Sequence, residues 1–175
     1  ERGHQVLRGI RPTGKPLRGD ERACDLTRMT EPGDWHGVLD GVDAVVNASG
    51  ILRETGAQRF ETIHVTAPLA LAQACAERGI DRFVQISALG LPEDGEFIAS
   101  KHRFDEALRE LPLQAVVLRP SVVYATAGSY GGTSLLRALT AFPGAQLLPG
   151  GGHWPIQPVA AEDLGTLVAL ALQAP

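Results

Sequence analysis

The sequence has 175 residues, of which 44% are hydrophobic and 21% charged, as is typical of one globular domain with a sizeable core. Its net charge of −4 argues against nucleic acid or an anionic membrane as the main partner, because neither would be attracted electrostatically. We expect no transmembrane segment and no secretory signal, since no apolar run is long enough to span a bilayer.

Predicted strands and helices alternate along the chain. In order they are strand 4–10, strand 21–26, strand 44–48, helix 61–80, strand 81–90, helix 96–111, strand 113–125, helix 131–142, and a strand end leading into a helix at 158–173. Several strands are continuous apolar runs, which indicates strands buried on both faces of a parallel sheet with helices on each side. The connection rules then favour an α/β fold with a doubly wound parallel sheet.

Small and polar residues follow the predicted strands, at the edge where such sheets bind ligands. The NASG segment (residues 47–50) leaves room for a flat group to approach the backbone. Gly50 alone would equally serve a turn. The other strand ends carry Arg11-Pro12, Asp25-Leu26, Ser87-Ala88-Leu89-Gly90 and Arg119-Pro120-Ser121.

The helix 96–111 places a lysine on its apolar face. Phe97, Phe104 and Leu108 recur at helical spacing, and Lys101 falls on the same stripe. Burying a lysine is costly. Either its side chain extends past the edge of the core into water, or its ammonium group points into a ligand cleft.

Five motifs occur in a characteristic order: VVNASG, RFVQISALG, SK in the next helix, LRPSVVYA and QPVAAEDLG. Together they resemble the extended or atypical short-chain dehydrogenases/reductases, the NAD(P)-dependent epimerase/dehydratase group. Within that group the sequence is most similar to the branch of the Rossmann-fold accessory subunit of respiratory complex I. The resemblance covers Gly3 to about Leu172 and implies a Rossmann-like domain that binds a nicotinamide dinucleotide.

The resemblance also implies which residues contact the cofactor. Arg11 stands where an arginine favours the 2′-phosphate of NADP and an acid would favour NAD, so we expect NADP, with NAD as the alternative. Guanidinium suits phosphate through bidentate bonds, although exposed arginines are common at strand ends. Asp25 and Leu26 match the pair that contacts adenine. The remaining matches are Asn47, Ala48, Ser49 and Gly50 for pyrophosphate and ribose, and Pro120, Ser121 and Val122 beside the nicotinamide.

The catalytic motif of the family, a tyrosine followed four positions later by a lysine, is only half present. The resemblance implies that Lys101 holds the ribose hydroxyls of the nicotinamide half. Phe97 takes the tyrosine position, and a phenyl ring has no proton to transfer. Ser87 matches a family serine and is the second candidate catalytic residue, but Ala88 replaces a frequent second hydroxyl. His64 stands where the family usually has asparagine, and would bond either backbone or the active centre.

Three functions are compatible with these residues. We favour an NADP(H)-binding protein with little or no tyrosine-dependent turnover, whose further partner is an unknown small molecule or protein. The second is an active reductase or epimerase-like enzyme that uses Lys101 alone, with the loop 126–132 as a lid. The third is an interaction scaffold without cofactor, against which the small residues of the NASG segment argue.

The resemblance predicts the extent of the domain, and the cysteines predict its compartment. We expect a single domain over residues 1–175 that lacks the first strand, the glycine-rich turn and the substrate-binding tail of the family. Cys24 and Cys75 are far apart, and no histidine spacing suggests a metal. The sequence therefore predicts a reduced cytoplasmic protein without a metal site.

Overall fold

A parallel three-stranded sheet lies at the centre of the structure. The computed structural model describes residues 3–125, 149–153 and 155–173, together with the single residues 128, 134, 138, 141 and 143. The strands β3 (Ala44–Asn47), β4 (Arg82–Ile86) and β5 (Gln114–Leu118) pair in that order, all in parallel. This pairing confirms the prediction from the apolar strands.

Two shorter parallel pairs accompany this sheet. The strand β1 (Arg8–Ile10) pairs with β2 (Glu21–Ala23), and β6 (Val123–Tyr124) pairs with β7 (Val159–Ala160). The prediction of a strand over 4–10 is too long, because the partner strand begins only at Glu21, opposite Arg8. The predicted strand 113–125 is interrupted after Leu118, where Pro120 has no N–H to donate to a sheet.

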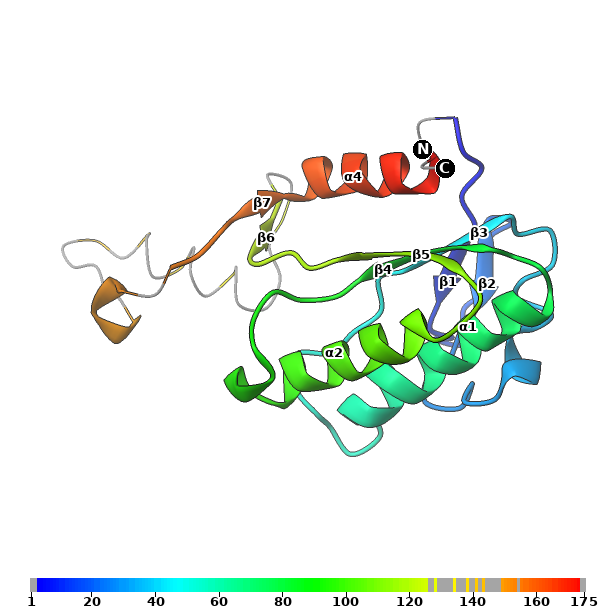
Figure 1. Cartoon of the computed structure of the whole chain (residues 1–175), viewed down its shortest axis with the longest axis horizontal. Helices are drawn as coiled ribbons and strands as arrows, with labels where there is room; N and C mark the ends of the chain where they lie inside the picture. The colour runs from blue at the N-terminus through cyan, green and yellow to red at the C-terminus, as the bar shows by residue number, and fades with distance from the viewer. Residues whose placement is uncertain are drawn as a thin grey trace.

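Helices cover both faces of the central sheet (Figure 1). The helices α1 (Ala67–Glu77) and α2 (Glu96–Arg109) lie side by side on one face, and α4 (Ala161–Gln173) lies on the other. Short 3-10 turns occur at η1 (Pro32–Trp35), η3 (Pro92–Asp94) and η4 (Pro149–Gly152). The predicted helix 131–142 and the loop 126–132 lie outside the continuously described ranges.

The predicted helix 61–80 is not α-helical throughout. Its first part, η2 (Glu61–Thr66), is a π-helix that continues into α1. Pro68 has no N–H to donate to the carbonyl of His64, so regular α-helical bonding cannot pass this point. The helix ends at Glu77, three residues before the predicted end, because Gly79 adopts a φ of 70° and stops the helix in the left-handed conformation.

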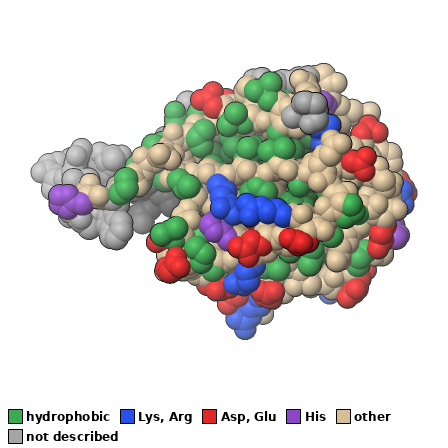
Figure 2. Space-filling model, in the orientation of Figure 1, with side chains coloured by type: hydrophobic (Ala, Val, Ile, Leu, Met, Phe, Trp, Pro, Cys, Tyr) green, Lys and Arg blue, Asp and Glu red, His purple; other side chains and the backbone are tan. Residues whose placement is uncertain are grey.

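The main core lies between the sheet and the pair α1 and α2. Phe83 of β4 and Phe104 of α2 are fully buried, with their ring centroids 6.2 Å apart. Leu108 is fully buried beside them, which confirms the apolar face predicted for α2. On the opposite side, Leu167 and Leu170 of α4 are exposed, and hydrophobic side chains gather along this side of the molecule (Figure 2). Among the described residues, no helix is both long and apolar enough to span a bilayer.

Candidate functional site

A cavity of about 260 Å³ lies beyond the carboxyl ends of β1, β2 and β3. It brings together six of the residues predicted to bind a cofactor, which are separated by up to 39 positions in the sequence. These are Arg11, Asp25, Leu26, Ala48, Ser49 and Gly50. The position matches the edge at which doubly wound sheets bind their ligands.

The acidic residue of the cavity is held by its own loop. The Asp25 carboxylate accepts hydrogen bonds from the hydroxyl and the backbone N–H of Thr27, at 2.6 and 3.1 Å. The Thr27 hydroxyl lowers the pKa of Asp25, and the positive charges of Arg11 and Arg28 lower it further. Asp25 is therefore a fixed negative charge at neutral pH, and Arg11 is an exposed positive charge near it.

The Asn47 side chain folds back onto the NASG segment. The Asn47 Oδ1 accepts hydrogen bonds from the Ser49 N–H at 3.1 Å and from the Ser49 hydroxyl at 2.6 Å. The Asn47 amide also donates to Gln85 Oε1 at 2.8 Å in the neighbouring strand. Asn47 is buried and does not line the cavity, so its side chain shapes the segment from behind.

Gly50 permits a close approach of two side chains. A Cβ built on it would lie 3.0 Å from Lys101 Nζ and 3.4 Å from His64 Nε2. Its φ is not in the left-handed region, so a turn does not explain the glycine. The close approach of Lys101 and His64 does, and it connects the NASG segment with α2 and η2.

Lys101 is buried directly behind the NASG segment. Its side chain is 5% exposed, so it does not extend past the core into water. The ammonium group donates to the carbonyls of Ser49 at 2.6 Å and Ile86 at 3.3 Å. Burial lowers the pKa of Lys101 to about 8, against the charge of Asp105, which raises it. An ammonium has three N–H donors, and these two carbonyls occupy two of them.

The Ser87 hydroxyl is bonded to a buried carboxylate. Its hydroxyl donates to Asp105 Oδ2 at 2.7 Å, and Ser87 is not part of the cavity lining. The same carboxylate oxygen is paired with Arg119 at 2.9 Å. Sequence reasoning missed Asp105. The available signal was a carboxylate one helical turn after Lys101, on the same buried stripe.

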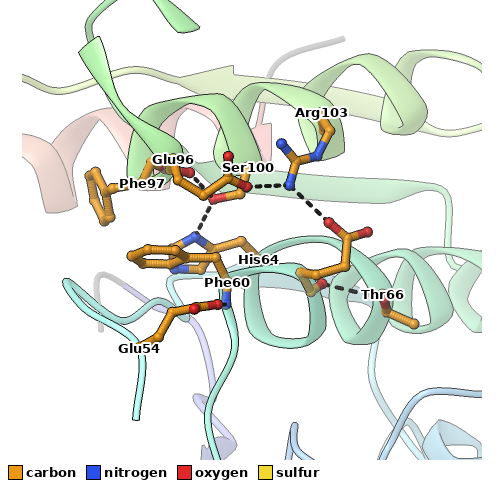
Figure 3. A network of polar contacts seen from close by, with 9 residues as sticks. Glu54, Phe60, His64, Thr66, Glu96, Phe97, Ser100 and Arg103 are labelled. Atoms are coloured by element: carbon orange, nitrogen blue, oxygen red, sulfur yellow. Dashed lines mark hydrogen bonds and ion pairs between the residues drawn. The ribbon is translucent and has the colours of Figure 1, made fainter. Parts of the chain in front are cut away.

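His64 connects three segments, and Figure 3 shows its bond to Ser100 of α2. Its Nε2 accepts the Ile51 N–H at 2.9 Å, which leaves the proton on Nδ1 for donation to Ser100 Oγ at 2.8 Å. Ser100 in turn donates to the Glu96 carbonyl at 2.7 Å. Burial lowers the pKa of His64 to about 4, with the charge of Lys101 as a further cause. Neutral His64 thus bonds backbone, one of the two roles predicted for it.

Phe97 is part of an aromatic cluster with His64 and Phe60 (Figure 3). Its ring stands edge-on to the His64 ring at 5.6 Å and to the Phe60 ring at 6.4 Å. The packing gives the phenyl ring a structural role and places no proton donor there.

The segment predicted to lie beside the nicotinamide is apart from the cavity lining. Pro120, Ser121 and Val122 follow β5, and none of them lines the cavity. The Pro120 carbonyl accepts the Leu89 N–H at 2.9 Å, which holds this segment against the end of β4. The cavity therefore unites only the predicted adenosine and pyrophosphate contacts. Among the described residues, no three His, Cys, Asp or Glu side chains gather as metal ligands.

A family model and a curated relative match this chain. The family model described as NAD(P)H-binding matches residues 1–147. The mouse protein NADH dehydrogenase [ubiquinone] 1 alpha subcomplex subunit 9, mitochondrial, is 31% identical over 84 residues, which are 47% of this chain and 22% of the mouse protein. The chain thus aligns with less than a quarter of this curated relative.

Solved structures extend the comparison. A putative NAD-dependent epimerase/dehydratase from Bacillus halodurans is 25% identical, with a TM-score of 0.53 over 60% of this chain and 50% of that chain. The UDP-N-acetylglucosamine 4-epimerase from Bacillus cereus shares the fold at 20% identity, with a TM-score of 0.62 over 90% of this chain and 62% of that chain. With the family model matching most of its length, the chain belongs to the NAD(P)H-binding family and has the Rossmann-like fold of the epimerase/dehydratase group.

Proposed function

We propose that the protein binds NADP(H) with little or no tyrosine-dependent dehydrogenase turnover. The observation that carries the proposal is the cavity in which Arg11, Asp25 and Leu26 meet the NASG segment. Its residues fit a dinucleotide, because a guanidinium group, a carboxylate and a closely approachable backbone suit phosphate and ribose. Gly50 keeps the backbone clear at the point where Lys101 lies behind it.

Arg11 supports NADP over NAD. Its exposed guanidinium lines the cavity at the end of β1, and a guanidinium can bind a 2′-phosphate through two charge-assisted hydrogen bonds. The Asp25 carboxylate is bonded to Thr27 rather than directed at this position. Arg11 is therefore the group expected to distinguish the two nucleotides.

Phe97 and Ser87 support low turnover. A bound nicotinamide supplies hydride chemistry, but a reduction also needs a group that transfers a proton. Phe97 packs in an aromatic cluster, and the Ser87 hydroxyl donates to Asp105. Among the described residues the one tyrosine is Tyr124, which is exposed in β6. In this proposal Lys101 binds a ribose hydroxyl with its third N–H.

One observation favours a second candidate function, a reductase that uses Lys101 as its acid. The pKa of Lys101 is about 8, and a general acid works best with a pKa near the working pH. This function requires substrate turnover that Lys101→Met abolishes while NADPH still binds.

The name of the mouse relative is that of a subunit of a protein complex, which supports a protein complex as a further partner of this chain. The same name places the mouse protein in mitochondria. The cysteines of this chain, by contrast, predict the cytoplasm.

The NADP preference is tested by Arg11→Ala in the full-length protein. Loss of the charge-assisted bonds should weaken NADPH binding by about tenfold or more and leave NADH binding unchanged. The matched control is Arg109→Ala, which removes an exposed arginine at the far end of α2 and should change neither affinity. Equal binding of NADPH and NADH by the parent protein would refute the preference.

A further inference from the structure

Asp105 is the fully buried carboxylate of α2, one helical turn after Lys101. One of its oxygens, Oδ2, accepts the Ser87 hydroxyl at 2.7 Å and the Arg119 guanidinium at 2.9 Å. The other oxygen, Oδ1, has no hydrogen-bond partner among the described residues and is also buried. A buried charge is costly unless it is compensated. Both donors thus bind the same oxygen, and the negative charge on Oδ1 is not compensated by a hydrogen bond within the described residues.

Lys101 is a buried positive charge whose hydrogen bonds supply no negative charge. Its ammonium group is buried, and its two hydrogen bonds go to the neutral carbonyls of Ser49 and Ile86. Carbonyls orient an ammonium group but carry no full negative charge. The charge of Asp105 opposes the effect of burial on Lys101.

The other ionisable groups around Lys101 do not supply this charge. His64 of η2 is neutral, because its Nε2 accepts the Ile51 N–H. Glu61 of η2 is exposed and paired with Arg103 at 2.8 Å. The remaining groups on elements packed against α2 are Glu93 and Asp94 of η3, which are exposed, Glu77 of α1, which pairs with His36 at the surface, and Arg119 after β5, a cation held by Asp105.

We propose that Asp105 is a positioning residue whose buried negative charge keeps Lys101 protonated, so that its ammonium group stays available to a ligand hydroxyl. Ser87, which follows β4, and Arg119, which follows β5, hold the carboxylate in place. The Ser87 hydroxyl donates its hydrogen to Asp105. In this proposal Ser87 therefore positions Asp105 and does not donate to a substrate. The ligand part of this inference rests on the proposed nucleotide binding.

Loss of the charge would matter at neutral pH. The pKa of Lys101, about 8, leaves most of the molecules protonated at pH 7. The charge of Asp105 raises the pKa of Lys101, as an opposite charge on the same buried side of a helix favours the charged form of a lysine. Without Asp105 a larger fraction of the molecules would lack the ammonium charge at pH 7.

The test is a pH titration of Lys101 by NMR in the full-length protein, with lysine labelled at Cε. The signal that disappears in Lys101→Arg is assigned to Lys101, and exposed Lys15, the other lysine of these 175 residues, serves as an internal reference. Asp105→Asn should lower the Lys101 midpoint by about one pH unit or more. The control Glu106→Gln, which removes the exposed neighbouring carboxylate of α2, should leave it unchanged.

A second variant keeps the test decisive if Asp105→Asn does not fold. Arg119→Gln removes the cation that offsets Asp105, so the Lys101 midpoint should rise. An unchanged midpoint in Asp105→Asn, or an unchanged or lowered one in Arg119→Gln, would overturn the proposal. NADPH affinity should fall with rising pH in parallel with the Lys101 titration. If the midpoint moves as expected but NADPH never binds, the counter-charge role stands and the proposed nucleotide function fails.

Discussion

At the scale of single residues, Gly50 is the point where the NASG segment, α2 and η2 meet. A side chain there would press on Lys101 Nζ at 3.0 Å and Cε at 3.3 Å. These atoms are the flexible end of a lysine, so they would move rather than block folding. The movement would break the 2.6 Å bond from Lys101 to the Ser49 carbonyl.

We therefore expect Gly50→Ala to weaken NADPH binding by about tenfold, because the displaced ammonium group would lose its proposed charge-assisted hydrogen bond to a ribose hydroxyl. Its melting temperature should change little in comparison. Gly37→Ala is the matched control, because a Cβ at Gly37 meets nothing within 4 Å. Isothermal titration of both variants decides the matter, and parent-like affinity in Gly50→Ala would show that the close approach has no bearing on binding.

Single residues also mark the limit of prediction from sequence. Lys101 was found because a lysine on an apolar stripe conflicts with the cost of burial. Asp105 presents the same conflict but lies on a helix with several other acids, so its burial does not stand out. The sequence does not show that Asp105 meets Ser87 and Arg119, because those contacts depend on how α2 packs against the strand ends.

At the scale of elements, η2 and α2 are joined through His64. The imidazole holds Ile51 beside the NASG segment and Ser100 in α2, and the rings of Phe60 and Phe97 pack against it. This arrangement needs the neutral imidazole, because Nε2 accepts a hydrogen bond. The π-helical form of η2 was not predicted, since apolar spacing is similar in a π-helix and an α-helix over so few residues.

The pH dependence of stability follows from His64. Folding lowers its pKa from 6.5 to about 4, so the unfolded chain binds the proton more readily. The stability that neutral His64 contributes is complete above pH 6.5 and is lost as the pH falls toward 4. The loss is on the order of 3 kcal/mol.

His64→Asn should reduce the slope of unfolding free energy against pH in this window, as measured by denaturant titration at several pH values. The exposed His36 pairs with Glu77 at the surface, and His36→Asn should leave most of the slope intact. An identical slope in His64→Asn and the parent would mean that His64 is not the group that titrates.

At the scale of the whole molecule, the architecture was largely predictable. Continuous apolar strands such as β3 and β4 indicated a parallel sheet, and the structure confirms both the sheet and its helical cover. The short pairs β1–β2 and β6–β7 were less well predicted, because their lengths depend on where the partner strand begins. Of the residues predicted at strand ends, Arg11, Asp25, Leu26 and residues 48–50 line the cavity, whereas Asn47, Ser87 and residues 120–122 do not.

The central claim is that this assembly of strand ends binds NADP(H). Calorimetric titration of the full-length protein with NADPH and, separately, with NADH tests it most directly. We expect NADPH to bind with micromolar affinity and more tightly than NADH. Binding of neither nucleotide would contradict the account and leave a Rossmann-like scaffold whose partners must be sought among proteins.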